Sequence, residues 1–326
     1  MLELPQKRRG GACMLNMYLT DENGKLKETE ILSKGCWVNL VNPTEEEINQ
    51  VVQQTNIPID FIKDPLDVDE RSRIEKEDDD ILIIVGLPVK VKDDVDSALY
   101  DTIPLGIIVT PFYFITVCLE DNPIIGKFIH RRVRGFYTYM KTRFTLQILY
   151  EVASYYLNYL KYIDRRSSLI ERELHESMRN EELFELLSLE KTLVYFTTSL
   201  KANKIVLEKM TRQHFLKVYE DDMDLLDDVM IEVKQAIEMC EVHSNILSGM
   251  MDAYASVISN NVNGVMKFLT TVTIILSLPT MVSSFFGMNL HGLPWQSSPH
   301  GFWLAFLASL VLSSVTALIF WKKRYF

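Results

Sequence analysis

Residues 263–289 of the chain read NGVMKFLTTVTIILSLPTMVSSFFGMN. They open a segment without charge, because no Lys, Arg, Asp or Glu stands between Phe268 and Trp321, whereas 24% of all residues are charged. This segment holds two apolar runs, Phe268–Phe286 and Phe302–Trp321, separated by a polar turn that contains Pro and Gly. At a helical rise of about 1.5 Å per residue, each run is about 28–30 Å long, which matches the hydrocarbon core of a bilayer. The sequence therefore predicts a membrane hairpin at the end of a large water-soluble part.

The basic residues around the two runs predict the orientation of this hairpin. Lys267 precedes the first run and a Lys-Lys-Arg triplet follows the second, while the connection Gly287–Gly301 holds neither Lys nor Arg. By the positive-inside rule, both termini are expected in the cytoplasm and the short loop outside. We expect no cleaved signal peptide, because no apolar stretch follows the N-terminal Lys and Arg residues. The four cysteines are scattered without a CxxC spacing, as expected for ordinary thiols in a reducing compartment.

The composition also disfavours several functional classes. A net charge of −10 argues against a nucleic-acid partner. The sequence contains no P-loop, no GxSxG and no HExxH motif. We therefore expect a protein that is not an enzyme and that has no organic cofactor.

The first 122 residues have the mixed pattern of an α/β domain. The expected strands are Cys13–Leu19, Glu28–Leu32, Cys36–Leu40, Ile81–Val91, Ile103–Thr110 and Phe112–Leu119. Thr44 and Glu47 form a capping box that begins a helix reaching Gln54. Pro58 begins a second, shorter helix that runs toward Asp67.

The following region, 123–262, is predicted to be helical, because Gly and Pro nearly vanish between Tyr137 and Asn263. Helices are expected at about 123–134, 143–178 and 181–214. A fourth runs from near 220 straight into the first apolar run, with a length on the order of 90 Å. Such a helix is not stable alone in water, so it must pack against its neighbours or against copies of itself.

The predicted architecture is an α+β membrane protein with a long helical stalk and two C-terminal transmembrane helices. Its expected parts are a cytoplasmic α/β domain (1–122), a helical domain and stalk (123–262), a first membrane helix (263–289), an outer loop (290–301), a second membrane helix (302–321) and a basic tail (322–326).

A stripe of side chains recurs at coiled-coil period along the first membrane helix. The members of this stripe are Asn263, Met266, Thr270, Thr273, Ser277, Thr280 and Ser284. All but Met266 are small or polar, and their alternating spacing of three and four places them on one helix face. Two interpretations stay open: close packing of helices in lipid, or the lining of a water-filled pore. A pore would require an oligomer, because one chain supplies only two membrane helices.

The tripeptide Gly287-Met288-Asn289 stands where the first run leaves the membrane. In this position it resembles the signature of the CorA family of magnesium transport proteins. The resemblance continues upstream at Ser248-Gly249, Asp252, Tyr254, Ser256, Ser259-Asn260, Asn263, Val265-Met266-Lys267, Leu269-Thr270 and Pro279. Two C-terminal spans, a basic tail, a stalk helix and an N-terminal α/β domain also match, so the similarity covers essentially the whole chain.

The resemblance implies a homopentameric funnel in a lipid bilayer that takes up divalent cations, Mg²⁺ above all, and is gated by intracellular Mg²⁺. Mg²⁺ gives up its water shell reluctantly, so a ring of Asn289 amide oxygens would hydrogen-bond to the waters of the hydrated ion. Gly287 would let the chain turn out of the helix, and Met288 would pack behind the ring. Residues implied to face the ion path are Asn263, Met266, Ser277, Thr280 and Ser284, with Leu269 or Thr270 at a hydrophobic constriction.

A regulatory site is also implied, because family members pair a stalk carboxylate with one on the neighbouring subunit's α/β domain. Counting back from Asn289 without gaps, Asp228 takes the stalk position. Its partner would lie in the segment Asp64–Asp69, with Asp64 and Asp69 as candidates for a Mg²⁺ site. A solvated acidic helix face is the alternative. At the other end of the chain, Lys322, Lys323 and Arg324 would form a basic collar, or serve only as a topology anchor.

One departure from the family pattern leaves the ion open. Many members follow Gly-Met-Asn with Met-Pro-Glu-Leu, but the stretch Leu290–Trp295 contains no carboxylate that could attract cations. His291 and His300 in this loop would either favour transition metals or simply be exposed. A cobalt, nickel or zinc transporter of the same family is therefore an alternative. A membrane-anchored coiled-coil sensor or scaffold is the alternative from another class, although an anchor needs neither the stripe nor Asn289.

Overall fold

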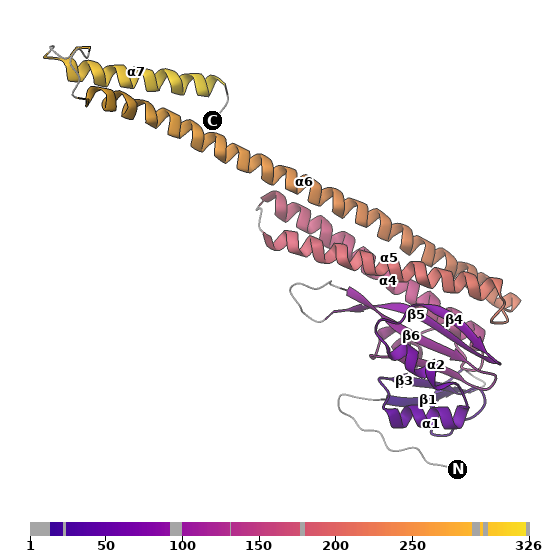
Figure 1. The fold of residues 1–326 in the computed structure, drawn as a ribbon. Helices are drawn as coiled ribbons and strands as arrows, with labels where there is room; N and C mark the ends of the chain where they lie inside the picture. Colours follow the sequence, from indigo (N-terminus) through magenta and orange to yellow (C-terminus); the bar gives the residue numbers. More distant parts are fainter. Residues whose placement is uncertain are drawn as a thin grey trace. The chain divides into compact units, whose positions relative to one another are not determined.

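The computed structural model describes residues 14–21, 24–91, 100–130, 132–176, 180–288, 294–295 and 299–323. The chain divides into two compact units, Met1–Gly249 and Met250–Phe326. Helix α6 (Glu220–Phe286) begins in the first unit and ends in the second (Figure 1).

The first unit is built on a sheet that has seven strands among the described residues, in the order β2-β1-β3-β7-β6-β5-β4. The strands are β1 (Met14–Thr20), β2 (Leu26–Glu28), β3 (Trp37–Val41), β4 (Arg73–Glu77), β5 (Asp80–Lys90), β6 (Tyr100–Val109) and β7 (Phe114–Cys118). β3 and β7 pair in parallel, and the other neighbours pair antiparallel. Every residue of β3 and β7 is buried, because helices cover both faces of the sheet at its centre.

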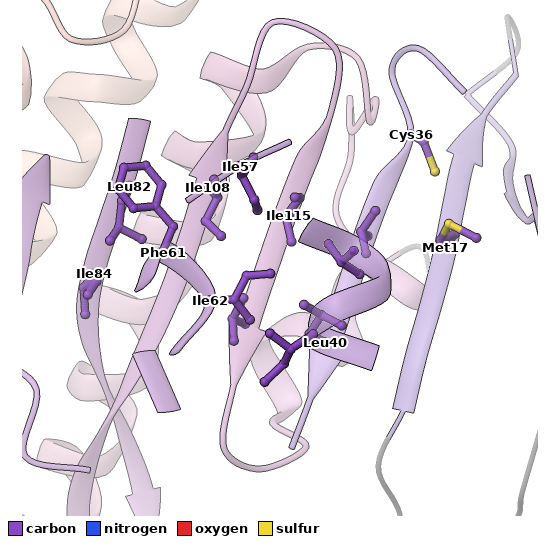
Figure 2. Packing of buried hydrophobic residues seen from close by; sticks show 14 residues of the cluster. Met17, Cys36, Leu40, Ile57, Phe61, Ile62, Leu82, Ile84, Ile108 and Ile115 are labelled. Atoms are coloured by element: carbon purple, nitrogen blue, oxygen red, sulfur yellow. The ribbon is translucent and has the colours of Figure 1, made fainter. Parts of the chain in front are cut away.

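One face of the sheet is covered by α1 (Glu45–Thr55), α2 (Ile59–Lys63) and the short helix η1 (Asp64–Leu66). Figure 2 shows apolar side chains of α2, such as Phe61 and Ile62, packed against Leu82, Ile84 and Ile108 of the sheet. The predicted capping box of α1 is confirmed. The Glu47 N–H donates to Thr44 Oγ1 at 3.2 Å, and the Thr44 N–H donates to Glu47 Oε2 at 2.8 Å.

The opposite face carries α3 (Pro123–Ile129), α4 (Lys141–Glu176) and α5 (Asn180–Arg212) (Figure 1). An amide side chain fastens α5 to the sheet at Gly86 of β5. The Gly86 N–H donates to Asn203 Oδ1 at 2.9 Å, and Asn203 Nδ2 donates to the Gly86 carbonyl at 2.8 Å. A Cβ added at Gly86 would lie 2.0 Å from Ser199 Oγ, so this close approach of helix and sheet requires glycine.

Two strand predictions are wrong. The second strand covers Leu26–Glu28 rather than Glu28–Leu32, because the Thr29 hydroxyl accepts from the Ile31 N–H and turns the chain away. Strand β4, with the sequence RIEKE, was not predicted at all. It is an edge strand whose exposed side chains are mostly charged, so it lacks the apolar alternation on which a strand prediction rests. The helix expected at 123–134 ends at Ile129.

The second unit contains the C-terminal part of α6 and helix α7 (Gly301–Lys322). Both helices are long and apolar enough to cross a membrane. Only 6% of the most apolar 18-residue window of each is buried, which distinguishes them from core helices of a soluble domain. The expected continuation of the stalk into the first apolar run is confirmed as one helix, which contains Pro279.

Candidate ion path and regulatory site

The stripe of Asn263, Met266, Thr270, Thr273, Ser277, Thr280 and Ser284 lies on α6 and is called the α6-face stripe below. It is exposed along its whole length in the single chain. Exposed residues are Asn263, Met266, Thr270, Thr273, Ser277, Thr280 and Ser284, together with Leu269. At about 100° per residue, these side chains lie within one broad face of α6. Among the residues that the structure describes, no contact within the chain covers that face, so it is available to other copies of α6 or to water.

The buried side of the same helix segment lies opposite the stripe. Thr271 is 1% exposed, and Ile275, Val282 and Phe286 are half-buried. These residues lie about 130–170° around the helix from the centre of the stripe, by the same count of 100° per residue. The stripe is therefore not the surface on which this helix packs inside its own unit. Both interpretations stay open, because copies of α6 could pack closely through this face or line a pore with it.

An open groove runs along the stripe near the C-terminal end of α6. Its lining residues are Thr273, Leu276, Ser277, Thr280, Met281, Ser284, Phe285 and Met288. Three of its hydroxyls donate to backbone carbonyls of their own helix: Thr273 to Leu269 at 2.8 Å, Ser277 to Ile274 at 2.8 Å and Thr280 to Leu276 at 3.2 Å. Each hydroxyl hydrogen is thus used, and the oxygen lone pairs remain as acceptors. Such a surface suits a hydrated cation, whose waters point their hydrogens outward.

Gly287, in the described part of the predicted filter, is the first residue after α6. α6 ends at Phe286, and the Gly287 N–H still donates to the Ser283 carbonyl at 2.9 Å. Gly287 does not adopt a left-handed φ, and an added Cβ would lie 3.3 Å from the Ser283 carbonyl oxygen. The chain therefore leaves α6 at Gly287 without a left-handed φ, and the role of this glycine in the filter stays a prediction.

Met288 and Trp295 lie in the connection between α6 and α7. Met288 is 48% exposed and lines the groove rather than packing behind other side chains of the described chain. Asn289 and His291 lie outside the described residues. Trp295, which the sequence did not single out, stacks on Phe286 with ring centroids 6.2 Å apart. An aromatic side chain at a helix end is typical of a membrane–water interface and was the available signal.

The acidic residues at the start of α6 are not all alike. Asp228 is exposed, as are Asp224 and Asp227, and these carboxylates are accessible to a cation. Asp222 is the exception, because its side chain is 7% exposed and accepts from Arg143 Nε at 2.6 Å. The interpretation of the cluster as a uniformly solvated helix face is therefore wrong at this position.

Of the two candidate partners of Asp228, Asp64 is bonded to an arginine of its own chain, whereas Asp69 is exposed. Asp64 accepts from Arg73 Nη2 at 2.6 Å, and partial burial raises the pKa of this carboxyl against the opposing effect of Arg73. Arg73 also contacts Glu70 and Glu75. Asp69 is exposed, and its N–H donates to Asp67 Oδ1 at 3.1 Å. Sequence reasoning missed Arg73 because nothing in the spacing of residues 64 and 73 shows that the two side chains meet.

Within the described residues of one chain, no group of three or more His, Cys, Asp or Glu side chains is gathered around a point that could hold a metal ion. In the basic tail, Lys322 is the last residue of α7 and Lys323 follows it, both exposed. Arg324 lies outside the described residues.

Comparisons with known proteins agree on the family. The family model described as CorA-like Mg2+ transporter protein matches residues 33–324. A cobalt/magnesium transport protein CorA of Methanocaldococcus jannaschii is 28% identical over 300 residues, which are 89% of this chain and 90% of that protein.

Solved structures give the same result for the fold. The complete structure of the CorA magnesium transporter from Methanocaldococcus jannaschii superposes with a TM-score of 0.84 at 25% identity, covering 97% of this chain and 99% of that one. The full-length CmaX protein superposes with a TM-score of 0.73 over 97% of this chain and all of that one, and at 16% identity this likeness supports the fold alone. With a family model that spans nearly the whole chain and an α/β domain, a long helix and two apolar helices in the expected order, the chain belongs to the CorA-like Mg²⁺ transporter protein family, whose members are divalent-cation transporters and not enzymes.

Proposed function

We propose that the chain is one subunit of a homopentameric channel that admits Mg²⁺ through the α6-face stripe and the ring of Asn289. The observation that carries this proposal is that Thr273, Ser277, Thr280 and Ser284 are exposed on the side of α6 opposite its buried and half-buried residues from Thr271 to Phe286. A stripe so placed can line a central axis when α6 helices of several copies come together. The hydroxyl oxygens of Ser277 and Thr280 would then accept hydrogen bonds from the waters of the passing ion.

The membrane-embedded parts in this proposal are residues 263–289 and 302–321, with both termini in the cytoplasm. The basic residues Lys267, Lys322 and Lys323 support that orientation through the positive-inside rule. A divalent cation that enters a cell with a negative interior gains about 2.3 kcal/mol per charge for each 100 mV, so no chemical energy source is needed.

Gating follows from the acidic side chains of the first unit. Facing carboxylates of two subunits repel each other, and a bound divalent cation relieves this repulsion and favours the closed arrangement. Asp228 is exposed and suited to such a site. Asp69 is the better partner, because Asp64 is already bonded to Arg73 in its own chain.

The experiment that tests the proposal is ion flux into liposomes that contain only the purified full-length protein. Mg²⁺, Co²⁺, Ni²⁺ and Zn²⁺ are compared singly and in competition, with a negative interior potential. We expect Mg²⁺ uptake that the other ions compete with. Uptake of Co²⁺, Ni²⁺ or Zn²⁺ without Mg²⁺ uptake would assign a different ion, and no flux of any ion would leave a membrane-anchored scaffold as the better interpretation.

A further inference from the structure

The first turn of α4 contacts two different parts of the first unit. Lys141 and Phe144 contact the sheet, whereas Thr142 and Arg143 contact the start of α6. Successive side chains of a helix point in different directions, so four adjacent residues can join two elements that do not follow each other in sequence. This short segment, 141–144, is called the α4 joint below.

On the side of the sheet, the α4 joint is fixed by a hydrogen bond and by aromatic packing. Lys141 Nζ donates to the Thr110 carbonyl at 2.5 Å, at the end of β6. The fully buried ring of Phe144 stacks on Phe114 with centroids 4.2 Å apart, and meets Trp37 edge to face at 5.0 Å. β3 and β7, which supply Trp37 and Phe114, are the parallel pair at the centre of the sheet. Movement of the sheet would therefore carry the first turn of α4 with it.

On the side of α6, the α4 joint is hydrogen-bonded both to the residues just before α6 and to the first turn of α6. Thr142 Oγ1 donates to the Lys217 carbonyl at 3.0 Å, just before α6 begins. Arg143 Nε donates to Asp222 Oδ1 at 2.6 Å, and its Nη2 donates to the Asp221 carbonyl at 3.0 Å. One guanidinium thus binds a buried carboxylate and the backbone beside it. Lysine cannot reproduce this fork, because it presents one point of charge.

Asp222 lies on the buried side of α6. Leu226, Val229 and Val233 are buried, and they follow Asp222 at intervals of four, three and four on the same side of the helix. Asp228 lies about 120° around the helix from Asp222 and is exposed. These buried apolar residues hold the rotation of α6 without Asp222, so loss of the Arg143–Asp222 bond should leave Asp228 exposed and able to bind the ion.

We infer that the α4 joint couples the α/β sheet to α6, and that Arg143 is a positioning residue that transmits the occupancy of the regulatory site to the helix that continues toward Gly287. This inference rests on the gating proposed above. The ion would be bound by exposed carboxylates, while the Arg143–Asp222 pair, which does not touch the ion, determines how far binding moves α6.

The test compares two measurements on the same full-length variants. Mg²⁺-dependent protection of the soluble part against proteolysis reports binding, and inhibition of liposome uptake by Mg²⁺ on the cytoplasmic side reports transmission. For Arg143→Gln we expect the midpoint of protection and the maximal uptake to stay within about twofold of the unchanged protein, while the half-inhibitory Mg²⁺ concentration rises by about tenfold, as for a lost coupling free energy of ordinary size. Asp222→Asn should shift inhibition in the same direction by a smaller factor, because an amide oxygen still accepts from Arg143.

Arg166→Gln is the matched control. Arg166 lies on the same helix and binds Glu185 of α5 through Nε at 2.5 Å, and within the described part of the chain it makes no hydrogen bond or ion pair to α6. It should leave protection and inhibition unchanged. If Arg143→Gln does not fold, the double variant Arg143→Gln/Asp222→Asn removes both charges together and is scored in the same way.

Unchanged inhibition in a folded Arg143 or double variant would overturn the inference. Equal shifts of protection and inhibition would also overturn it, since the pair would then support only the ion site or the fold. Absence of Mg²⁺ uptake by the unchanged protein would instead contradict the proposed function, so the two failures can be told apart.

Discussion

Single hydroxyl groups on α6 show why this helix suits a hydrated cation. Thr273, Ser277 and Thr280 each donate to a backbone carbonyl of their own helix, so their oxygens face the groove as acceptors. A hexahydrated Mg²⁺ presents only donors to its surroundings. Neutral acceptors bind such an ion weakly enough to let it leave again, which conduction requires. An amide oxygen at Asn289 would continue the same chemistry at the outer end.

The first prediction concerns Asn289. Asn289→Ala should reduce Mg²⁺ uptake in liposomes to the background of protein-free vesicles, because a methyl group cannot accept hydrogen bonds from the waters of the ion. Asn289→Gln keeps the amide and should retain part of the uptake. The assembly size in detergent should be the same for both variants. Near-normal Mg²⁺ uptake by Asn289→Ala in an intact assembly would contradict the assignment of Asn289 to the selectivity filter.

The second prediction concerns Lys141 and pH. Burial, followed by the charge of Lys34, lowers the pKa of Lys141 to about 8, against the opposing effect of Asp80. An unfolded lysine titrates near about 10.4, so between these two values the folded state binds fewer protons and stability rises with pH. Lys141→Met should lack this rise. The check is the difference in thermal unfolding between the two proteins from pH 7.5 to 9, and parallel curves would contradict the assignment.

At the scale of elements, local patterns predicted well wherever a capping motif or an apolar run lies within the element itself. The capping box at Thr44, the buried strands β3 and β7 and the unbroken helix α6 all have signals within a few residues of themselves. Edge strand β4 has no such signal, because its charged side chains point to water and only its pairing with β5 makes it a strand. The stripe was visible from spacing, but which side of α6 its own unit buries required coordinates.

The third prediction tests the exposed face of α6 by cysteine labelling. Ser277→Cys and Thr280→Cys should react with a small water-soluble thiol reagent in the assembled protein, whereas Ile275→Cys and Val282→Cys on the half-buried side should not. Leu276 is a poor control, because it is 65% exposed and lines the same groove. Equal labelling of both sets would favour plain helix packing over a pore.

The native thiols make this labelling practical. Cys36, Cys118 and Cys240 are buried, and burial raises the pKa of the first two to about 11 and of Cys240 to about 12. Few thiolates form at neutral pH, so these residues should react only after unfolding. Cys13 lies outside the described residues, and Cys13→Ser removes it as a source of background.

At the scale of the whole molecule, the regulatory site was the part least accessible to sequence reasoning. Asp228 could be placed by counting along one continuous helix, but the gapless count is lost before residues 64–69. Contacts far apart in sequence then decide which carboxylates are available. Arg73 is hydrogen-bonded to Asp64, and Arg143 is hydrogen-bonded to Asp222, which lies 79 positions further along the sequence. The local sequence pattern does not predict such pairs, so only the folded structure distinguishes carboxylates that are bonded to arginine from those that are accessible to an ion.

The last prediction follows from this separation. If Asp228 and Asp69 of neighbouring subunits share a Mg²⁺ ion, binding stabilises the closed assembly by about 2.7 kcal/mol at a hundredfold excess over the dissociation constant. Asp228→Ala should remove most Mg²⁺-dependent protection of the soluble part against proteolysis. Adding Asp69→Ala to it should cost little more, because the two residues act on one ion, whereas Asp64→Ala should add an independent loss through the freed Arg73. Asp228→Lys supplies a positive charge itself, so it should keep part of the protection without Mg²⁺. Full Mg²⁺-dependent protection in Asp228→Ala would mean that the acids of α6 do not bind the regulating ion, and non-additivity with Asp64 rather than Asp69 would reverse the choice of partner.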